Sequence, residues 1–105
     1  MERVGLSTGD WSVEGVMART FGDRLLGVWR APEGSAVVIA TRSVHNFGRR
    51  RPLVVVGLDA GMRVVETKTL RPNRLVAFRS ARIIIELPAG SPVPSKGDIV
   101  ELTSG

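Results

Sequence analysis

Short apolar runs separated by turn-forming residues dominate the chain. Three runs are almost uninterrupted: residues 36–41 (AVVIAT), 53–58 (LVVVGL) and 82–87 (RIIIEL). Runs of this length that are rich in valine and isoleucine, and are bounded by glycine, proline or aspartate, predict buried β-strands. Residues 11–18 alternate imperfectly between apolar and polar positions, and residues 99–102 follow a Lys-Gly-Asp turn, so each segment predicts a further strand.

The most specific local pattern is a hairpin. The run 53–58 is followed by Asp59, Ala60 and Gly61, and then by a second apolar-polar run over residues 62–69. A short loop that contains glycine between two such runs predicts an antiparallel hairpin, in which we expect Gly61 to adopt a positive φ angle.

The remaining segments complete the predicted fold. Thr20 can cap a short helix near residues 20–27, which Gly27 would end. Residues 1–10 are expected to form a flexible arm, and residues 11–105 a single β domain. A chain of 105 residues is long enough for one domain. The sequence therefore predicts a mainly β, compact single-domain β-sandwich or barrel of about six to eight short strands with one short helix.

Composition excludes several classes of chemistry. The chain has no cysteine and one histidine, His45, so disulfides, thiolate sites and sites that need two imidazoles are excluded. We expect no metal and no cofactor. No signal peptide, lipid anchor or transmembrane run is visible, so the sequence predicts a soluble cytoplasmic protein.

Charge is unevenly distributed along the chain. The formal net charge is +5, but residues 42–82 alone contain ten basic and two acidic residues. Such asymmetry suggests an anionic partner for one face. Almost all the basic residues are arginine, which suits bidentate contact with carboxylate or phosphate, although a coding bias toward arginine is an equally good explanation.

Four stretches, in order along the chain, carry a resemblance to a known family. They are residues 24–28 (RLLGV), 43–48 (SVHNFG) with 52–53 (PL), 58–61 (LDAG), and 70–74 (LRPNR) with 85–90 (IELPAG). Over residues 16–102 the chain resembles the prokaryotic family known as domain of unknown function number 192. The resemblance implies a mostly β, sandwich-like single domain and implies no activity. The family usually has an aspartate where this chain has Val54, so a role for that acid is not carried over, and many relatives are exported.

The candidate site lies in the basic central segment. We predict an anion- or partner-binding face formed by His45, Arg49, Arg50, Arg51 and Arg74. Two structural interpretations stay open: His45 could pack on the sheet and bond a backbone carbonyl, and the arginine run could be a charged edge that discourages aggregation.

Three functional hypotheses follow. The first is a non-catalytic binding module whose basic face binds a small anion or an acidic protein surface. The alternative is a nucleic-acid-binding domain that contacts phosphates through Arg49, Arg50, Arg51 and Arg74, with Phe47 or Phe78 stacking on bases. The third, an enzyme that uses His45 with Glu86 or Asp98, ranks last because no catalytic constellation is recognisable. We expect Glu86 to face solvent or form a salt bridge, and Arg82 to pair with Glu66 or Glu86.

Overall fold

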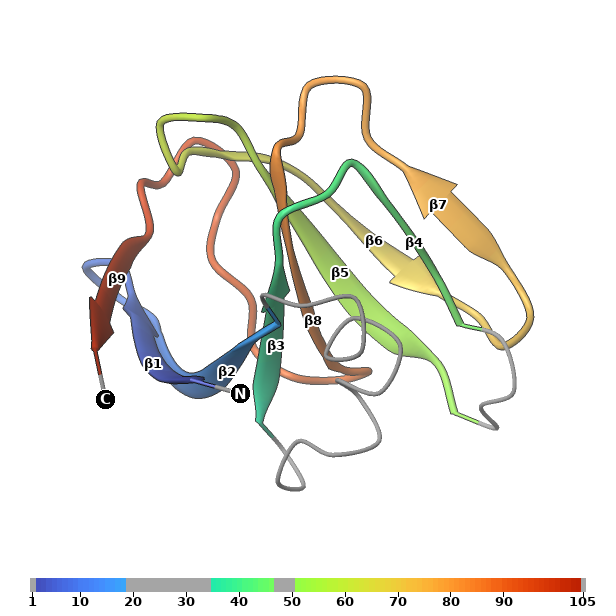
Figure 1. Ribbon diagram of the computed structural model, residues 1–105, viewed down its shortest axis with the longest axis horizontal. Helices are drawn as coiled ribbons and strands as arrows, with labels where there is room; N and C mark the ends of the chain where they lie inside the picture. Colours follow the sequence, from blue (N-terminus) through green and yellow to red (C-terminus); the bar gives the residue numbers. More distant parts are fainter. Residues whose placement is uncertain (1, 19–34, 47–50, 105) are drawn as a thin grey trace.

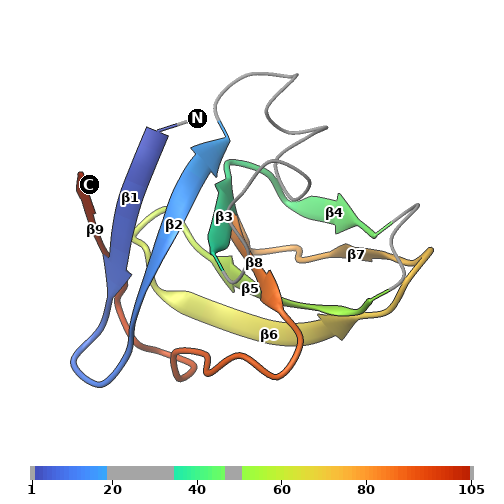
Figure 2. The ribbon, with the colours of Figure 1, turned by 90° about the horizontal axis from the view of Figure 1, so that it is seen from below.

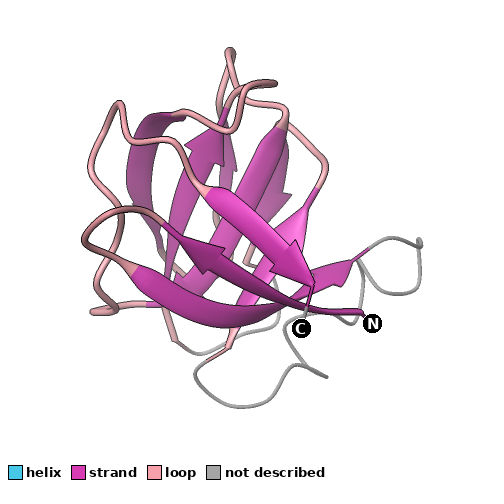
Figure 3. Cartoon of the chain, turned by 90° about the vertical axis from the view of Figure 1, so that its left-hand side faces the viewer, coloured by secondary structure: helices cyan, strands magenta, loops and turns pink. Residues whose placement is uncertain are grey.

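The computed structural model describes residues 2–18, 35–46 and 51–104, and within these residues it contains strands and no helix (Figures 1 and 3). Seven strands form one mixed sheet in the order β6-β5-β8-β3-β2-β1-β9, and two form a separate pair, β4-β7. No helix among the described residues is long and apolar enough to cross a membrane. The strands are β1 (Glu2–Ser7), β2 (Ser12–Ala18), β3 (Ala36–Ile39), β4 (Ser43–His45), β5 (Leu53–Leu58), β6 (Val64–Leu70), β7 (Leu75–Ala77), β8 (Ile83–Pro88) and β9 (Glu101–Ser104).

The large sheet curls until its two ends meet at one point. β6 is the first strand of the sheet and β9 is the last, yet the start of β6 bonds to the segment that leads into β9. The Val64 amide donates to the Asp98 carbonyl at 2.8 Å, and the Val100 amide donates to the Met62 carbonyl at 2.9 Å. Figure 2 shows the sheet curving from β9 and β1 round to β5 and β6. The sheet is therefore a barrel that is closed by these bonds only at this end.

Two apolar cores lie on opposite faces of the curled sheet. The inner core gathers side chains from both ends of the sheet, including Leu6 of β1, Val64 of β6 and Val100. The outer core lies between the central strands and the β4-β7 pair, which contributes Val44 and is followed by Phe78. Figure 1 shows this pair on the opposite side of the molecule from β1 and β9.

The central strands supply both cores, and this explains their uninterrupted apolar runs. Because successive side chains of a strand point to opposite faces, Val38 enters the inner core while Val37 and Ile39 enter the outer one. Val56 and Val55 divide in the same way on β5. A strand buried on both faces has no position for a polar residue that lacks a partner.

The mainly β fold predicted from the sequence is confirmed, with two differences among the described elements. Residues 2–7 form β1 and not the flexible arm expected, because the alternation of Val4 and Leu6 lets both side chains enter the inner core. β4 and β7 are additional strands that the apolar pattern did not predict. The helix expected near residues 20–27 lies outside the described residues.

The β5-β6 hairpin is present as predicted, but its turn differs by one residue. The Met62 amide donates to the Asp59 carbonyl at 3.0 Å, and Met62, not Gly61, adopts the positive φ of 65°. The Asp59 side chain accepts from the amides of Gly61 at 2.9 Å and Arg63 at 3.0 Å. These bonds place the left-handed residue after the turn, as in a three-residue hairpin loop.

Two glycines of this hairpin give opposite predictions for alanine substitution. A Cβ at Gly57 would lie 2.9 Å from Cδ2 of the buried Phe78 ring, whereas a Cβ at Gly61 would have its nearest neighbour at 3.4 Å. We expect Gly57→Ala to lower the free energy of unfolding by about 1–3 kcal/mol through overpacking. Gly61→Ala should change it by no more than about 0.5 kcal/mol. Urea denaturation of both variants measures this, and a Gly61→Ala variant as unstable as Gly57→Ala would contradict the turn geometry.

Candidate anion-binding surface around Asn46

The short β4-β7 pair brings two of the predicted basic residues to the same end of the molecule. β4 and β7 run antiparallel, and His45 is the cross-strand partner of Leu75. Just beyond the pair, the Asn46 amide donates to the Arg74 carbonyl at 3.0 Å, and the Asn73 amide donates to the Asn46 carbonyl at 2.7 Å. His45 and Arg74 are therefore neighbours, although they lie 29 positions apart in the sequence.

The side chain of Asn46 ties this pair to the large sheet. Asn46 is 0% exposed. Its Nδ2 donates to the Arg51 carbonyl at 2.9 Å and to the Leu70 carbonyl at 3.1 Å. Because both amide hydrogens face carbonyl oxygens, the orientation of the amide is fixed. Its Oδ1 is buried and has no hydrogen-bond partner among the residues that the structure describes.

Four exposed basic residues lie on or next to the backbone segments that bond to Asn46. They belong to the segments that Asn46 joins, and we call them the basic surface: His45, Arg51, Arg71 and Arg74. The turn that carries two of them is held by a bond from the Arg74 amide to the Arg71 carbonyl at 3.3 Å and by Asn73 at a φ of 60°. Asparagine adopts this left-handed conformation more readily than most residues. Residues 43–46, 51–54 and 70–77 contain no acidic residue, so no carboxylate of these segments neutralises the surface.

The predicted site residues are brought together in part. His45, Arg51 and Arg74 converge, while Arg49 and Arg50 lie outside the described residues. The structure adds Arg71, which the sequence offered only as part of a general basic excess. It also adds Asn46, which no charge or motif argument had singled out. The sequence signal for Asn46 was its place inside the stretch 43–48 that carries the family resemblance.

Other sequence-based expectations are wrong. Phe78 is 2% exposed in the outer core, so it cannot stack on a base, and Phe47 lies outside the described residues. Of the two alternatives for Glu86, the solvent-facing one is wrong: Glu86 is 4% exposed on β8, opposite Val37 and Val55. Arg82 pairs with neither glutamate, since its Nη1 donates to the Ala81 carbonyl and Glu66 pairs with Lys68.

The residues of the enzyme hypothesis are not all brought together. Asp98 bonds to Val64 at the start of β6, whereas the His45 end adjoins Leu70 at the end of that strand. Seven residues of β-strand separate these points by about 20 Å. Val54, at the position where the resembled family has aspartate, packs against the inner core. Within residues 2–18, 35–46 and 51–104, no three or more His, Cys, Asp or Glu side chains gather as metal ligands would.

Comparisons with known proteins show relatives in sequence and in structure. No family model matches the chain. The chain is 35% identical over 102 residues to a UPF0127 protein of Pyrococcus horikoshii, covering 87% of this chain and 89% of that protein. A "putative transcription regulator" of Sinorhizobium meliloti has a similar structure, with a TM-score of 0.70 at 20% identity, covering 95% of this chain and 92% of that one. A protein of unknown function from Novosphingobium aromaticivorans also has a TM-score of 0.70, at 16% identity, covering 94% and 83%.

Replacing Asn46 tests whether it holds the basic surface together. Asn46→Ala removes two donors and leaves the Arg51 and Leu70 carbonyls without them, so we expect the free energy of unfolding to fall by about 2–4 kcal/mol. Asn46→Asp should be at least as destabilising, because it places a carboxylate against the same two carbonyl oxygens. Urea denaturation at neutral pH measures both losses. An Asn46→Asp variant as stable as the wild type would show that the amide is oriented differently.

Proposed function

The chain belongs to the UPF0127 family, and we propose that it is a non-catalytic binding module whose basic surface binds an acidic segment of a partner protein. The family name assigns no activity, so the proposal depends on the surface itself. The observation that carries it is that the backbone segments bearing His45, Arg51, Arg71 and Arg74 are joined at the buried Asn46.

The geometry suits carboxylate recognition. Arginine presents a planar set of donors that can grip a carboxylate in bidentate fashion. Three such side chains project from segments whose backbones are joined to Asn46 by hydrogen bonds of 2.9–3.1 Å or by the adjoining turn. Because these backbones are fixed, a partner has to order only the arginine side chains and not the loops that carry them.

An exposed apolar residue favours a protein partner over a free anion. Leu75, the cross-strand neighbour of His45, is 63% exposed. A phosphate or other small anion gains nothing from this side chain, whereas a protein segment can bury it inside a ring of charged contacts. The acidic partner is therefore expected to carry an apolar residue among its carboxylates.

Nucleic acid is the second candidate. The same arginines, with Arg49 and Arg50, would contact phosphates. In support, the Sinorhizobium meliloti neighbour carries a name that points to transcription regulation. The burial of Phe78 argues against it, because one of the two aromatic residues expected to stack on bases is unavailable.

We also propose that the chain is related to the family known as domain of unknown function number 192. Two of the stretches that carry the resemblance, residues 43–48 and residues 70–74, contribute directly to the basic surface. The bond from Asn46 Nδ2 to the Leu70 carbonyl joins them. We propose that this junction is what the shared pattern preserves.

Neutralising the basic surface should abolish binding of an acidic peptide. We would measure fluorescence anisotropy of a labelled peptide that contains aspartate, glutamate and leucine, with a labelled single-stranded oligonucleotide in parallel. Arg51→Gln/Arg71→Gln/Arg74→Gln should weaken peptide binding at least about tenfold at about 50 mM salt, with a smaller difference at about 200 mM. The charge-matched control Arg63→Gln/Arg79→Gln/Arg82→Gln should retain most of the wild-type affinity.

Substitution of Leu75 separates the two candidate partners. Leu75→Ser should weaken peptide binding by about threefold to tenfold, through loss of apolar burial, and should leave oligonucleotide binding unchanged. Tighter binding of the oligonucleotide than of the peptide, with a steep loss of affinity between the two salt concentrations, would favour the nucleic-acid candidate. No binding of either probe at the lower salt concentration would overturn the proposed function.

A further inference from the structure

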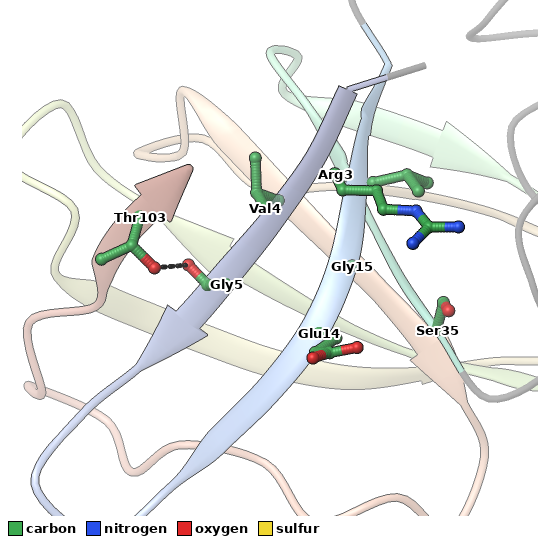
Figure 4. Close-up of a pocket in the computed structure, with 8 residues that line it drawn as sticks. Arg3, Val4, Gly5, Glu14, Gly15, Ser35 and Thr103 are labelled. Atoms are coloured by element: carbon green, nitrogen blue, oxygen red, sulfur yellow. Dashed lines mark hydrogen bonds between the residues drawn. The ribbon is translucent and has the colours of Figure 1, made fainter. Parts of the chain in front are cut away.

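A second polar surface lies on the side of the molecule away from the β4-β7 pair (Figure 1). It is a hollow of about 500 Å³ over β1 and β2, bordered by β9 and by Ser35, which precedes β3 (Figure 4). Its lining includes Arg3 and Glu14, one cationic and one anionic side chain, both exposed. None of the four residues of the basic surface lines it, so the hollow is a separate candidate site.

Glycine at position 5 creates the floor of this hollow. Gly5 of β1 is paired with Thr103 of β9 on one side and with Glu14 of β2 on the other. The parallel register of β2 and β3, which pairs Gly15 with Ala36, places Ser35 beside Glu14. A Cβ at Gly5 would lie only 2.7 Å from Thr103 Oγ1. In the row Thr103, Gly5, Glu14 and Ser35, the position without a side chain is therefore Gly5, and the Thr103 hydroxyl leans over it.

The two charged side chains face the same space without neutralising each other. Figure 4 shows the Glu14 carboxylate over β2, with the Arg3 guanidinium and Ser35 to the right of that strand. By register Arg3 is opposite Val16, so it is a diagonal neighbour of Glu14, at a typical separation of about 7–8 Å between the backbones. Within residues 2–18, 35–46 and 51–104, neither charged side chain forms an ion pair.

We propose that this hollow binds a free α-amino acid, with the ligand carboxylate on Arg3 and the ligand ammonium on Glu14. A simple anion would be attracted by Arg3 and repelled by Glu14. A simple cation would be attracted by Glu14 and repelled by Arg3. A zwitterion is the class of small molecule that satisfies both charges at once. The volume is in the range of small-molecule sites and larger than one amino acid needs, so the side chain of the ligand has room in the hollow.

NMR titration of the whole chain with a panel of the standard amino acids tests this site. We expect at least one amino acid to shift the backbone amide signals of Gly5, Gly15 and Thr103. The N-acetyl derivative of that amino acid has lost its positive charge and the amide derivative its negative charge, so each should bind at least about tenfold more weakly.

Charge-removing variants provide the matched controls. Arg3→Gln and Glu14→Gln should each weaken binding about tenfold, whereas the exposed charges removed by Arg79→Gln and Asp10→Asn should not matter. The amide spectrum of each variant reports its folding. The proposal would be overturned if no amino acid shifts these signals at about 10 mM, if a singly charged derivative binds as well as the zwitterion, or if the shifts map to the basic surface.

Discussion

Burial of both faces of three central strands is the constraint on which the rest of the structure depends. β3, β5 and β8 each send alternate side chains into the inner and the outer core. The inner core is covered because the sheet curls until the start of β6 bonds to residues 97–100. On the opposite face, the outer core is covered in part by the β4-β7 pair, which contributes Val44, and by Phe78, which follows β7. The curvature of the large sheet and the second sheet therefore have the same effect, because each shields one apolar face of the central strands from water.

The amino-acid sequence predicts those strands whose burial is visible in the apolar character of their own side chains. Residues 53–58 are a strand with the predicted bounds because all but one of its side chains are buried, and apolar composition records that burial. β4 and β7 are invisible to the same argument, since each has three residues and only Val44 is fully buried. Such strands form because a segment distant in the sequence offers its backbone for hydrogen bonding. The composition of the strand itself does not indicate that pairing. The prediction that Gly61 adopts the positive φ is wrong for a related reason. The hydrogen bonds from the Gly61 and Arg63 amides to the Asp59 side chain fix the end of the turn, so Met62 takes the positive φ that glycine usually prefers.

The same distinction applies to the candidate site. The concentration of positive charge could be predicted, because charge is a property of single residues that adds along the chain. The sequence could not predict that these segments come together. That arrangement depends on the Asn46 side chain, which bonds to the carbonyls of Arg51 and of Leu70, the latter 24 positions away. A buried asparagine has no sequence signature apart from its context, and its value here comes from two donors that satisfy carbonyls at the junction of two sheets. Arg71 joins the basic surface only because the turn that contains Asn73 folds back onto Asn46.

Glu86 shows how a polar residue inside the core can specify the arrangement of the strands. By register it belongs to a row of cross-strand neighbours that runs from Arg3 through Val16 and Val37 to Glu86, and on through Val55 to Lys68. The row has charged side chains at its two ends, on strands β1 and β6, and one carboxylate at its middle. If β8 slipped by one residue, Glu86 would turn into the inner core, where the described side chains are all apolar and none can partner a carboxylate. Ile84, Ile85 and Leu87 are interchangeable enough in shape to tolerate such a slip, but Glu86 is not. A run of similar apolar residues does not by itself specify one register. The Glu86 carboxylate therefore fixes a single register for β8, the strand that contributes to both cores.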